Sequence, residues 1–183
     1  IRLIHSAIDM GINFIDTANV YEGYSRYLGS AGGVAEEIVG DALSDRRDKM
    51  ILTTKVGAPI GPGPQDRGLS PVHLLRELDR SLKRLKTDYI DLYQAHAPDP
   101  DTPIEETLRA FDDLVRSGKV RYLGVSDTPA WKIAEANVTA RFRGWSAFIG
   151  LQIEYSLLER TVEQELMPMA RELGLGVTPW SPL

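Results

Sequence analysis

Short apolar runs alternate with longer amphipathic segments along this chain of 183 residues. The apolar runs have the length of buried strands, and the segments between them repeat apolar residues at helical spacing. Alternation of this kind is typical of a parallel β/α sheet or barrel. The expected strands are 12–16, 50–56, 90–96, 120–126, 148–154 and 176–180.

The segments between the strands predict helices, several of which carry a start signal. Ser70 is the expected N-cap of a helix with Pro71 at its first position. Thr102 and Thr161 each begin a capping-box pattern, with a glutamate or glutamine three residues later. Further helices are expected over 2–10 and 34–43 and from Pro129 onward. Leucines after Ser70 predict the buried face of its helix: Leu74, Leu75, Leu78, Leu82 and Leu85.

A closed TIM-type (β/α)8 barrel has eight strands, and only six are expected here. The sequence therefore predicts an incomplete version of that barrel, surrounded by helices. No linker or low-complexity tract divides the sequence, and residues 1–183 are expected to form a single partial domain. Two open parallel edges would expose apolar surface to water. We therefore expect the chain either to belong to a longer protein or to need a partner that completes the sheet.

Composition narrows the function. The chain is 43% hydrophobic and 26% charged, with a net charge of −5 and no basic stripe, so nucleic acid is not an expected partner. No apolar run approaches the roughly 18 residues of a membrane span, and the first residues do not read as a signal peptide. The lack of cysteine excludes disulfide and thiolate chemistry, and we expect a cytoplasmic location.

Four polar residues stand at or just beyond the carboxyl ends of the first three strands. Asp16, Lys55 and His96 end strands that begin apolar on the same face, and Tyr21 follows Asp16 by five residues. Because residues two apart share a face and parallel strands end at one rim, these side chains are expected to meet in one pocket. A metal site is not predicted, since Asp91 falls on the opposite strand face from His96.

Such a group suits proton transfer to an oxygen that gains negative charge. An isolated tyrosine has a pKa of about 10, and a neighbouring ammonium favours the phenolate and lowers that value. A buried Lys55 would need an opposite charge, which Asp16 can supply, and His96 is suited to orient a carbonyl oxygen or relay a proton. Carbonyl reduction creates such an oxygen, and its hydride must come from a cofactor because no side chain supplies one.

Six sequence segments, spread over nearly the whole chain, form a specific combination. They read FIDTANVY, ILTTKVG, TDYIDLYQAHAPD, GKVRYLGVSD, LQIEYSLLER and VTPWSPL. In this order and spacing they resemble the aldo-keto reductase family. The resemblance implies a β/α barrel, a nicotinamide cofactor that is usually NADPH, and reduction of aldehydes or ketones to alcohols. It leaves NADH, the particular carbonyl substrate and the oligomeric state open.

The resemblance also implies roles for individual residues. Asp16, Tyr21, Lys55 and His96 match the catalytic residues of the family, with Tyr21 as the general acid. The implied cofactor contacts are Ser126, Asp127 and Gln152 near the nicotinamide amide, Trp180 on its ring, and Ser181 and Leu183 near the pyrophosphate.

The sequence departs from the family pattern in two places. Asp127 stands where the family usually has asparagine, and a carboxylate cannot donate the amide hydrogen bond. The stretch 22–33 is longer than the usual turn after the tyrosine and adds Tyr24 and Tyr27, which are rivals of Tyr21 for the role of acid.

Two alternatives to an active enzyme stay open. The resemblance extends to potassium-channel β-subunits, which use a reductase-like domain as a cofactor-sensing regulatory partner. A catalytically inert, truncated reductase is the other alternative, because the basic residues that hold the adenosine 2′-phosphate in the family follow the last motif found here. The interpretation we favour is an NADP(H)-dependent aldo-keto reductase that acts on a small-molecule carbonyl substrate.

Overall fold

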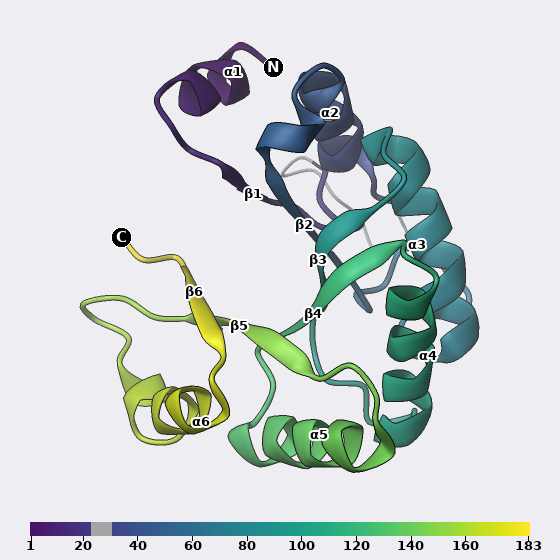
Figure 1. Cartoon of the computed structure of the whole chain (residues 1–183), viewed down its shortest axis with the longest axis vertical. Helices are drawn as coiled ribbons and strands as arrows, with labels where there is room; N and C mark the ends of the chain where they lie inside the picture. Colours follow the sequence, from purple (N-terminus) through teal and green to yellow (C-terminus); the bar gives the residue numbers. More distant parts are fainter. Residues whose placement is uncertain (23–30) are drawn as a thin grey trace.

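The computed structural model of this chain describes residues 1–22 and 31–183. Six parallel strands form one sheet in the order β1-β2-β3-β4-β5-β6. The strands are β1 (Phe14–Asp16), β2 (Ile51–Val56), β3 (Ile90–Ala95), β4 (Val120–Ser126), β5 (Phe148–Glu154) and β6 (Gly176–Trp180). The sheet curls into an arc whose two edges are β1 and β6 (Figure 1). The chain is therefore an incomplete (β/α) barrel, as the alternation of strands and helices predicts.

Helices line the outer side of the arc, one before the first strand and the others between successive strands (Figure 1). They are α1 (Arg2–Asp9), α2 (Val34–Leu43), α3 (Pro71–Leu85), α4 (Ile104–Arg116), α5 (Ala130–Arg143) and α6 (Leu166–Leu173). Short 3-10 turns occupy η1 (Arg47–Lys49) and η2 (Thr161–Glu163). No helix in the described ranges combines the length and the apolar character that crossing a bilayer requires.

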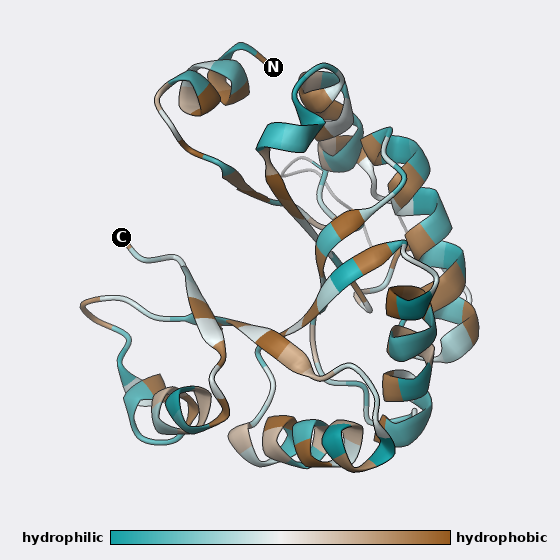
Figure 2. Cartoon of the chain, in the orientation of Figure 1, coloured by the Kyte–Doolittle hydropathy of each residue, from teal (hydrophilic) through white to brown (hydrophobic). Residues whose placement is uncertain are grey.

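The core lies between the sheet and the outer helices. Tyr93 on β3 and Leu123 on β4 pair in register and are almost fully buried. Phe111 of α4 packs between them and β5, with its ring 5.9 Å from that of Tyr93 and 6.0 Å from that of Phe148, both edge to face. Apolar segments alternate with polar ones on the helices and the strands (Figure 2). The outward strand residues thus hold the helices and leave the inner face free for other groups.

The inner face of the sheet exposes apolar side chains, as expected for an open barrel. Phe14 and Ile51 pair in register near the amino ends of β1 and β2 and are 36% and 43% exposed. Tyr122 on β4, which pairs with Leu92, is 58% exposed. In a closed barrel such side chains form a packed interior. Here they border the open side of the arc.

Of the three predicted side-chain caps, at Ser70, Thr102 and Thr161, one is confirmed and two are wrong. Ser70 is the N-cap of α3, and its hydroxyl accepts the His73 N–H. The Thr102 hydroxyl instead donates to Asp99 at 2.7 Å, and Pro103 becomes the N-cap of α4. The Thr161 hydroxyl bonds to Glu159, so its pattern starts only the turn η2, and α6 begins later. A nearby carboxylate outcompetes the helix for both threonines.

One member of the predicted buried stripe on α3 is also wrong. Leu74, Leu78 and Leu85 are buried, whereas Leu75 is 46% exposed. Leu75 follows Leu74 by a single residue, which turns its side chain by about 100° around the helix axis and away from the sheet. The sequence spacing alone fits either leucine, and the rotation of the helix decides that Leu74 is buried and Leu75 is not.

A buried carboxylate ties α4 to the segment that leads into β5. Asp112, 4% exposed, accepts hydrogen bonds from the backbone N–H of Ser146 at 2.8 Å and from its hydroxyl at 3.0 Å. Its other oxygen pairs with Arg116. Burial by itself raises the pKa of Asp112, but the hydrogen bonds from Ser146 and Arg116 outweigh it and hold that pKa below its ordinary value.

Asp112→Asn should lower the free energy of unfolding by about 1–3 kcal/mol, because the amide presents N–H groups to donors that need an acceptor. Urea denaturation at pH 7 would measure this as a lower midpoint at unchanged slope. The neighbouring Asp113→Asn, at an exposed position, is the matched control and should change stability by less than about 0.5 kcal/mol.

The effect of Asp112→Asn should also depend on pH. Because the native pKa is depressed, the carboxylate stabilises the fold above its unfolded pKa and loses that contribution as the pH falls through the native value. The gap between wild type and variant should therefore close in acid. A gap that stays constant from neutral pH into that range would contradict the assignment.

Candidate active site

A fully buried lysine lies at the centre of the rim. Lys55, near the end of β2, is 0% exposed. Its ammonium nitrogen lies 2.5 Å from Asp16 Oδ2, 3.0 Å from the Thr17 carbonyl oxygen and 3.4 Å from the Tyr21 hydroxyl. These three acceptors match the three N–H donors of an ammonium group. Burial of the charge is thus offset by one carboxylate and two further hydrogen bonds.

The Asp16 carboxylate joins four strands. It closes β1 and accepts the Lys55 ammonium from β2. Its other oxygen lies 3.4 Å from the Gln94 amide nitrogen on β3 and 3.3 Å from that of Gln152 on β5. The contact between β1 and β5 crosses the inside of the arc, because three strands separate them within the sheet. Curvature of the sheet therefore assembles this cluster.

Tyr21 sits above the ion pair on a short, well-anchored turn. Its backbone N–H bonds to the Ala18 carbonyl, and its own carbonyl accepts the Ala35 N–H. The phenol ring packs edge to face on the His96 imidazole, with 5.6 Å between the ring centroids, and the Lys55 ammonium lies 4.9 Å from its centroid. Tyr21 is 39% exposed. The structure thus brings Asp16, Tyr21, Lys55 and His96 together.

Buried contacts behind β2 support the turn that carries Tyr21. The Asn19 backbone N–H bonds to the Lys55 carbonyl oxygen at 3.2 Å, and its side-chain amide lies 3.5 Å from the fully buried Glu77 carboxylate of α3. Ala18 and Val20 pack with Ile60 in a small separate apolar cluster. The turn is therefore held on both its polar and its apolar side.

The residues expected at the cofactor lie along the other half of the rim. Ser126 pairs in register with Gln152, and the Asp127 N–H bonds to the Gln152 carbonyl oxygen. The Trp180 indole N–H donates to Asp127 Oδ1 at 2.9 Å. The structure thus gathers Ser126, Asp127, Gln152 and Trp180. Ser181 follows directly and is exposed, whereas Leu183 is fully exposed at the chain end and does not join the group.

These residues partly fit a nicotinamide. Trp180 is 37% exposed at the rim and presents an aromatic ring, while Ser126 and Gln152 offer a hydroxyl and an amide. Asp127 has a positive φ of 46°, a conformation that aspartate and asparagine tolerate better than most residues. Aspartate can therefore adopt the backbone conformation of this position, where the family usually has asparagine. Its carboxylate can only accept, so a carboxamide there would have to present its NH₂ group.

Sequence reasoning did not include two polar residues of this cluster among the site residues. Gln94 faces the rim from β3 and bonds to both Asp16 and the Thr53 hydroxyl, and Thr17 supplies a carbonyl oxygen to Lys55. Gln94 shares a strand face with His96, which was a usable signal, but no pattern marks a backbone carbonyl as a ligand. The rival tyrosines Tyr24 and Tyr27 lie outside the described residues.

The whole chain, residues 1–183, matches the sequence model of the aldo/keto reductase family. The fold and the rim cluster agree with this match, and the chain belongs to that family. It is 47% identical over 189 residues to a Bacillus subtilis (strain 168) protein named uncharacterized oxidoreductase YrpG, covering 100% of this chain and 56% of that protein.

Two further relatives carry different names. A probable voltage-gated potassium channel subunit beta of Oryza sativa subsp. japonica is 41% identical over 185 residues, covering 99% of this chain and 53% of that protein. Norsolorinic acid reductase of Aspergillus flavus is 37% identical over 191 residues, covering 100% of this chain and 47% of that protein. The chain thus spans about half the length of the curated relatives it matches.

The contact between Asp127 and Trp180 should hold the indole ring at the rim. In Asp127→Ala the indole N–H loses its acceptor, so its proton resonance should move upfield and exchange faster with water. A ¹H–¹⁵N spectrum measures this, with the signal assigned by its loss in Trp180→Phe. The exposed contact contributes less than about 1 kcal/mol. Alanine at this positive φ adds backbone strain of about 1–2 kcal/mol, so stability should fall by about 1–3 kcal/mol.

Asp127→Asn is the matched variant for this contact. Its side-chain carbonyl oxygen retains an acceptor and tolerates the positive φ, so the Trp180 resonance should stay close to its wild-type position. An unmoved signal in Asp127→Ala would show that the ring is held by other contacts.

Proposed function

We propose that the protein reduces an aldehyde or ketone to the alcohol, with Tyr21 donating the proton to the carbonyl oxygen. The observation that carries the proposal is the buried Lys55 ammonium, which touches both the Asp16 carboxylate and the Tyr21 hydroxyl. A nicotinamide cofactor supplies the hydride for the carbonyl carbon when bound. Membership of the aldo/keto reductase family and relatives named as an oxidoreductase and a reductase support this reaction class.

Lys55, Tyr21 and Asp16 differ in how far they are buried, and this difference indicates a separate role for each. Lys55 is sealed from solvent, whereas the Tyr21 ring is partly exposed and can reach a substrate. As the carbonyl carbon gains hydride, its oxygen takes the phenol proton and the Tyr21 oxygen is left negative. The Lys55 ammonium stabilises that charge, and the Asp16 carboxylate beside it offsets the burial of the ammonium. Solvent returns the proton to the exposed phenol after the alcohol leaves.

His96 is proposed to position the carbonyl oxygen next to Tyr21. Its imidazole packs against the edge of the Tyr21 ring, so a hydrogen bond from the imidazole and one from the phenol can converge on a single oxygen. The proposed cofactor contacts stay as the sequence predicts: Ser126, Asp127, Gln152, Trp180, Ser181 and Leu183. NADPH is the proposed reductant because the family resemblance implies it.

A regulatory subunit of a potassium channel is the second candidate function. It is favoured by two relatives, from Oryza sativa and Arabidopsis thaliana, each named as a probable voltage-gated potassium channel subunit beta and each 41% identical. Oxidation of NADPH followed with and without added aldehyde separates the two functions. Fast aldehyde-dependent turnover supports the enzyme, whereas cofactor binding without turnover supports the regulatory subunit. Failure to bind NADPH would support the inert alternative.

Tyr21→Phe should lower the rate of aldehyde reduction by about 10²- to 10⁴-fold, because it removes the proton donor and keeps the ring. Binding of NADPH, followed by cofactor fluorescence, should not change. Tyr24→Phe is the control for the rival tyrosine and should keep wild-type turnover. If Tyr24→Phe is inactive and Tyr21→Phe is not, the acid is misassigned.

The ion pair can be tested separately from the acid. Lys55→Met should lower turnover at least about 10²-fold and the free energy of unfolding by about 1–3 kcal/mol, since Asp16 is left partly buried without its partner. The double variant Lys55→Met with Asp16→Asn should recover part of the stability but none of the activity. Recovery of turnover in the double variant would contradict the role of the ammonium.

A further inference from the structure

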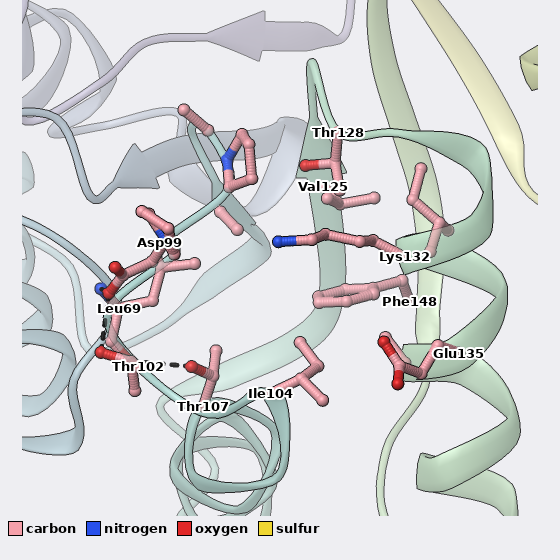
Figure 3. Close-up of a pocket in the computed structure, with 16 residues that line it drawn as sticks. Leu69, Asp99, Thr102, Ile104, Thr107, Val125, Thr128, Lys132, Glu135 and Phe148 are labelled. Atoms are coloured by element: carbon pink, nitrogen blue, oxygen red, sulfur yellow. Dashed lines mark hydrogen bonds between the residues drawn. The ribbon is translucent and has the colours of Figure 1, made fainter.

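A cavity lies on the outer face of the sheet, behind the rim. It has a volume of about 170 Å³ and is bounded by β3, β4, α4, α5 and the loop after β3 (Figure 3). Ala95 and Val125 form part of its wall. Each directly precedes a rim residue, His96 or Ser126, and alternation places the two sets on opposite faces of the sheet. The cavity is thus distinct from the proposed carbonyl site.

The cavity wall is mainly apolar. Leu69, Val125, Ile133 and Phe148 are all buried, and Ile104 of α4 closes the lower side (Figure 3). A cavity of about 150 Å³ with a similar aliphatic and aromatic wall accommodates benzene in another protein. The space between α4 and α5 therefore suits one ring or a branched aliphatic group.

Most polar groups at the cavity already have partners within the chain. The Thr107 hydroxyl donates to the Leu69 carbonyl at 3.1 Å, and the Thr128 hydroxyl donates to the Ser126 carbonyl at 2.9 Å. The Asp99 carboxylate accepts the Leu69 N–H at 2.7 Å along with two further hydrogen bonds. These groups therefore have little remaining hydrogen-bonding capacity for a ligand.

Lys132 is different. It is half-buried on α5, and its ammonium group points into the cavity (Figure 3). Among the described residues its ammonium makes no salt bridge or side-chain hydrogen bond, and it lies 5.4 Å from the centroid of the neighbouring Trp131 ring. Lys55, Lys86 and Lys119 each pair with a carboxylate. Lys49 and Lys83 have no salt bridge among the described residues either, but they are exposed, whereas Lys132 is half-buried at the cavity. A lysine charge beside an apolar cavity favours an anionic ligand group.

We propose that this cavity binds a small monoanion built on an apolar ring, such as an aryl carboxylate. The ring lies among Ile104, Ile133 and Phe148, and the carboxylate accepts hydrogen bonds from the Lys132 ammonium. Glu135, three residues after Lys132 on α5, lines the same side of the cavity, and Asp99 lines the side across from them (Figure 3). Both carry a negative charge, so a second anionic group on the ligand is disfavoured. This site does not depend on the proposed reductase function.

Benzoate is the probe that tests the proposal. Added to the protein, it should shift the methyl resonances of Ile104 and Ile133 saturably in ¹H–¹³C spectra, with a dissociation constant on the order of 1 mM for a ligand of this size. Lys132→Met, which keeps the stem and removes the charge, should weaken benzoate at least about 10-fold. The neutral analogue benzyl alcohol should bind both proteins equally.

Two further variants test where benzoate binds and whether it binds as an anion. Glu135→Gln should bind benzoate as tightly as wild type or up to several-fold more tightly, because it removes a negative charge. Tyr21→Phe should leave the shifts at Ile104 and Ile133 unchanged. The proposal fails if benzoate shifts only residues near Tyr21, if Lys132→Met binds it as well as wild type, or if no saturable shift occurs at 20-fold the expected dissociation constant, on the order of 20 mM.

Discussion

The Asp16 carboxylate is the group on which the rest of the site depends. A lysine with no exposed surface would be several kcal/mol too costly to keep charged without an opposite charge beside it, and Lys55 finds that charge 2.5 Å away. The same carboxylate also accepts hydrogen bonds from Gln94 and Gln152. One acidic side chain therefore stabilises the ammonium and joins four strands across the inside of the arc.

This arrangement separates the two faces of the sheet. The outer face carries Tyr93 and Leu123 against Phe111 and forms the packed core. The inner face starts apolar and exposed, at residues such as Ile51, and becomes polar toward the carboxyl ends. Stability and chemistry thus occupy different surfaces of the same strands. A change at the rim need not disturb the core, which is a property that parallel β/α architectures share.

Much of this organisation could be predicted from sequence, because it depends on local periodicity. All six strands and the meeting of Asp16, Lys55 and His96 follow from alternation along strands that end at a common rim, and Tyr21 joins them from the turn just after Asp16. The two errors in helix capping arose where a neighbouring carboxylate competes for the threonine hydroxyl. Thr102 has a capping pattern, yet Asp99, three residues earlier, takes its hydroxyl. The sequence pattern cannot show whether the Thr102 hydroxyl bonds to the helix or to Asp99, because the loop conformation sets both distances.

The sequence by itself determined the β/α order, the face of each strand and the residue types that reach the rim, because these depend on spacing along the chain. Only the tertiary structure decided which of them touch. Gln152 reaches Asp16 because the sheet curls. Trp180 donates to Asp127 because the carboxyl ends of β4 and β6 lie at the same height along the rim. Lys132 borders a cavity without a carboxylate partner for the same reason. Distances between residues far apart in sequence depend on the packing of every element between them.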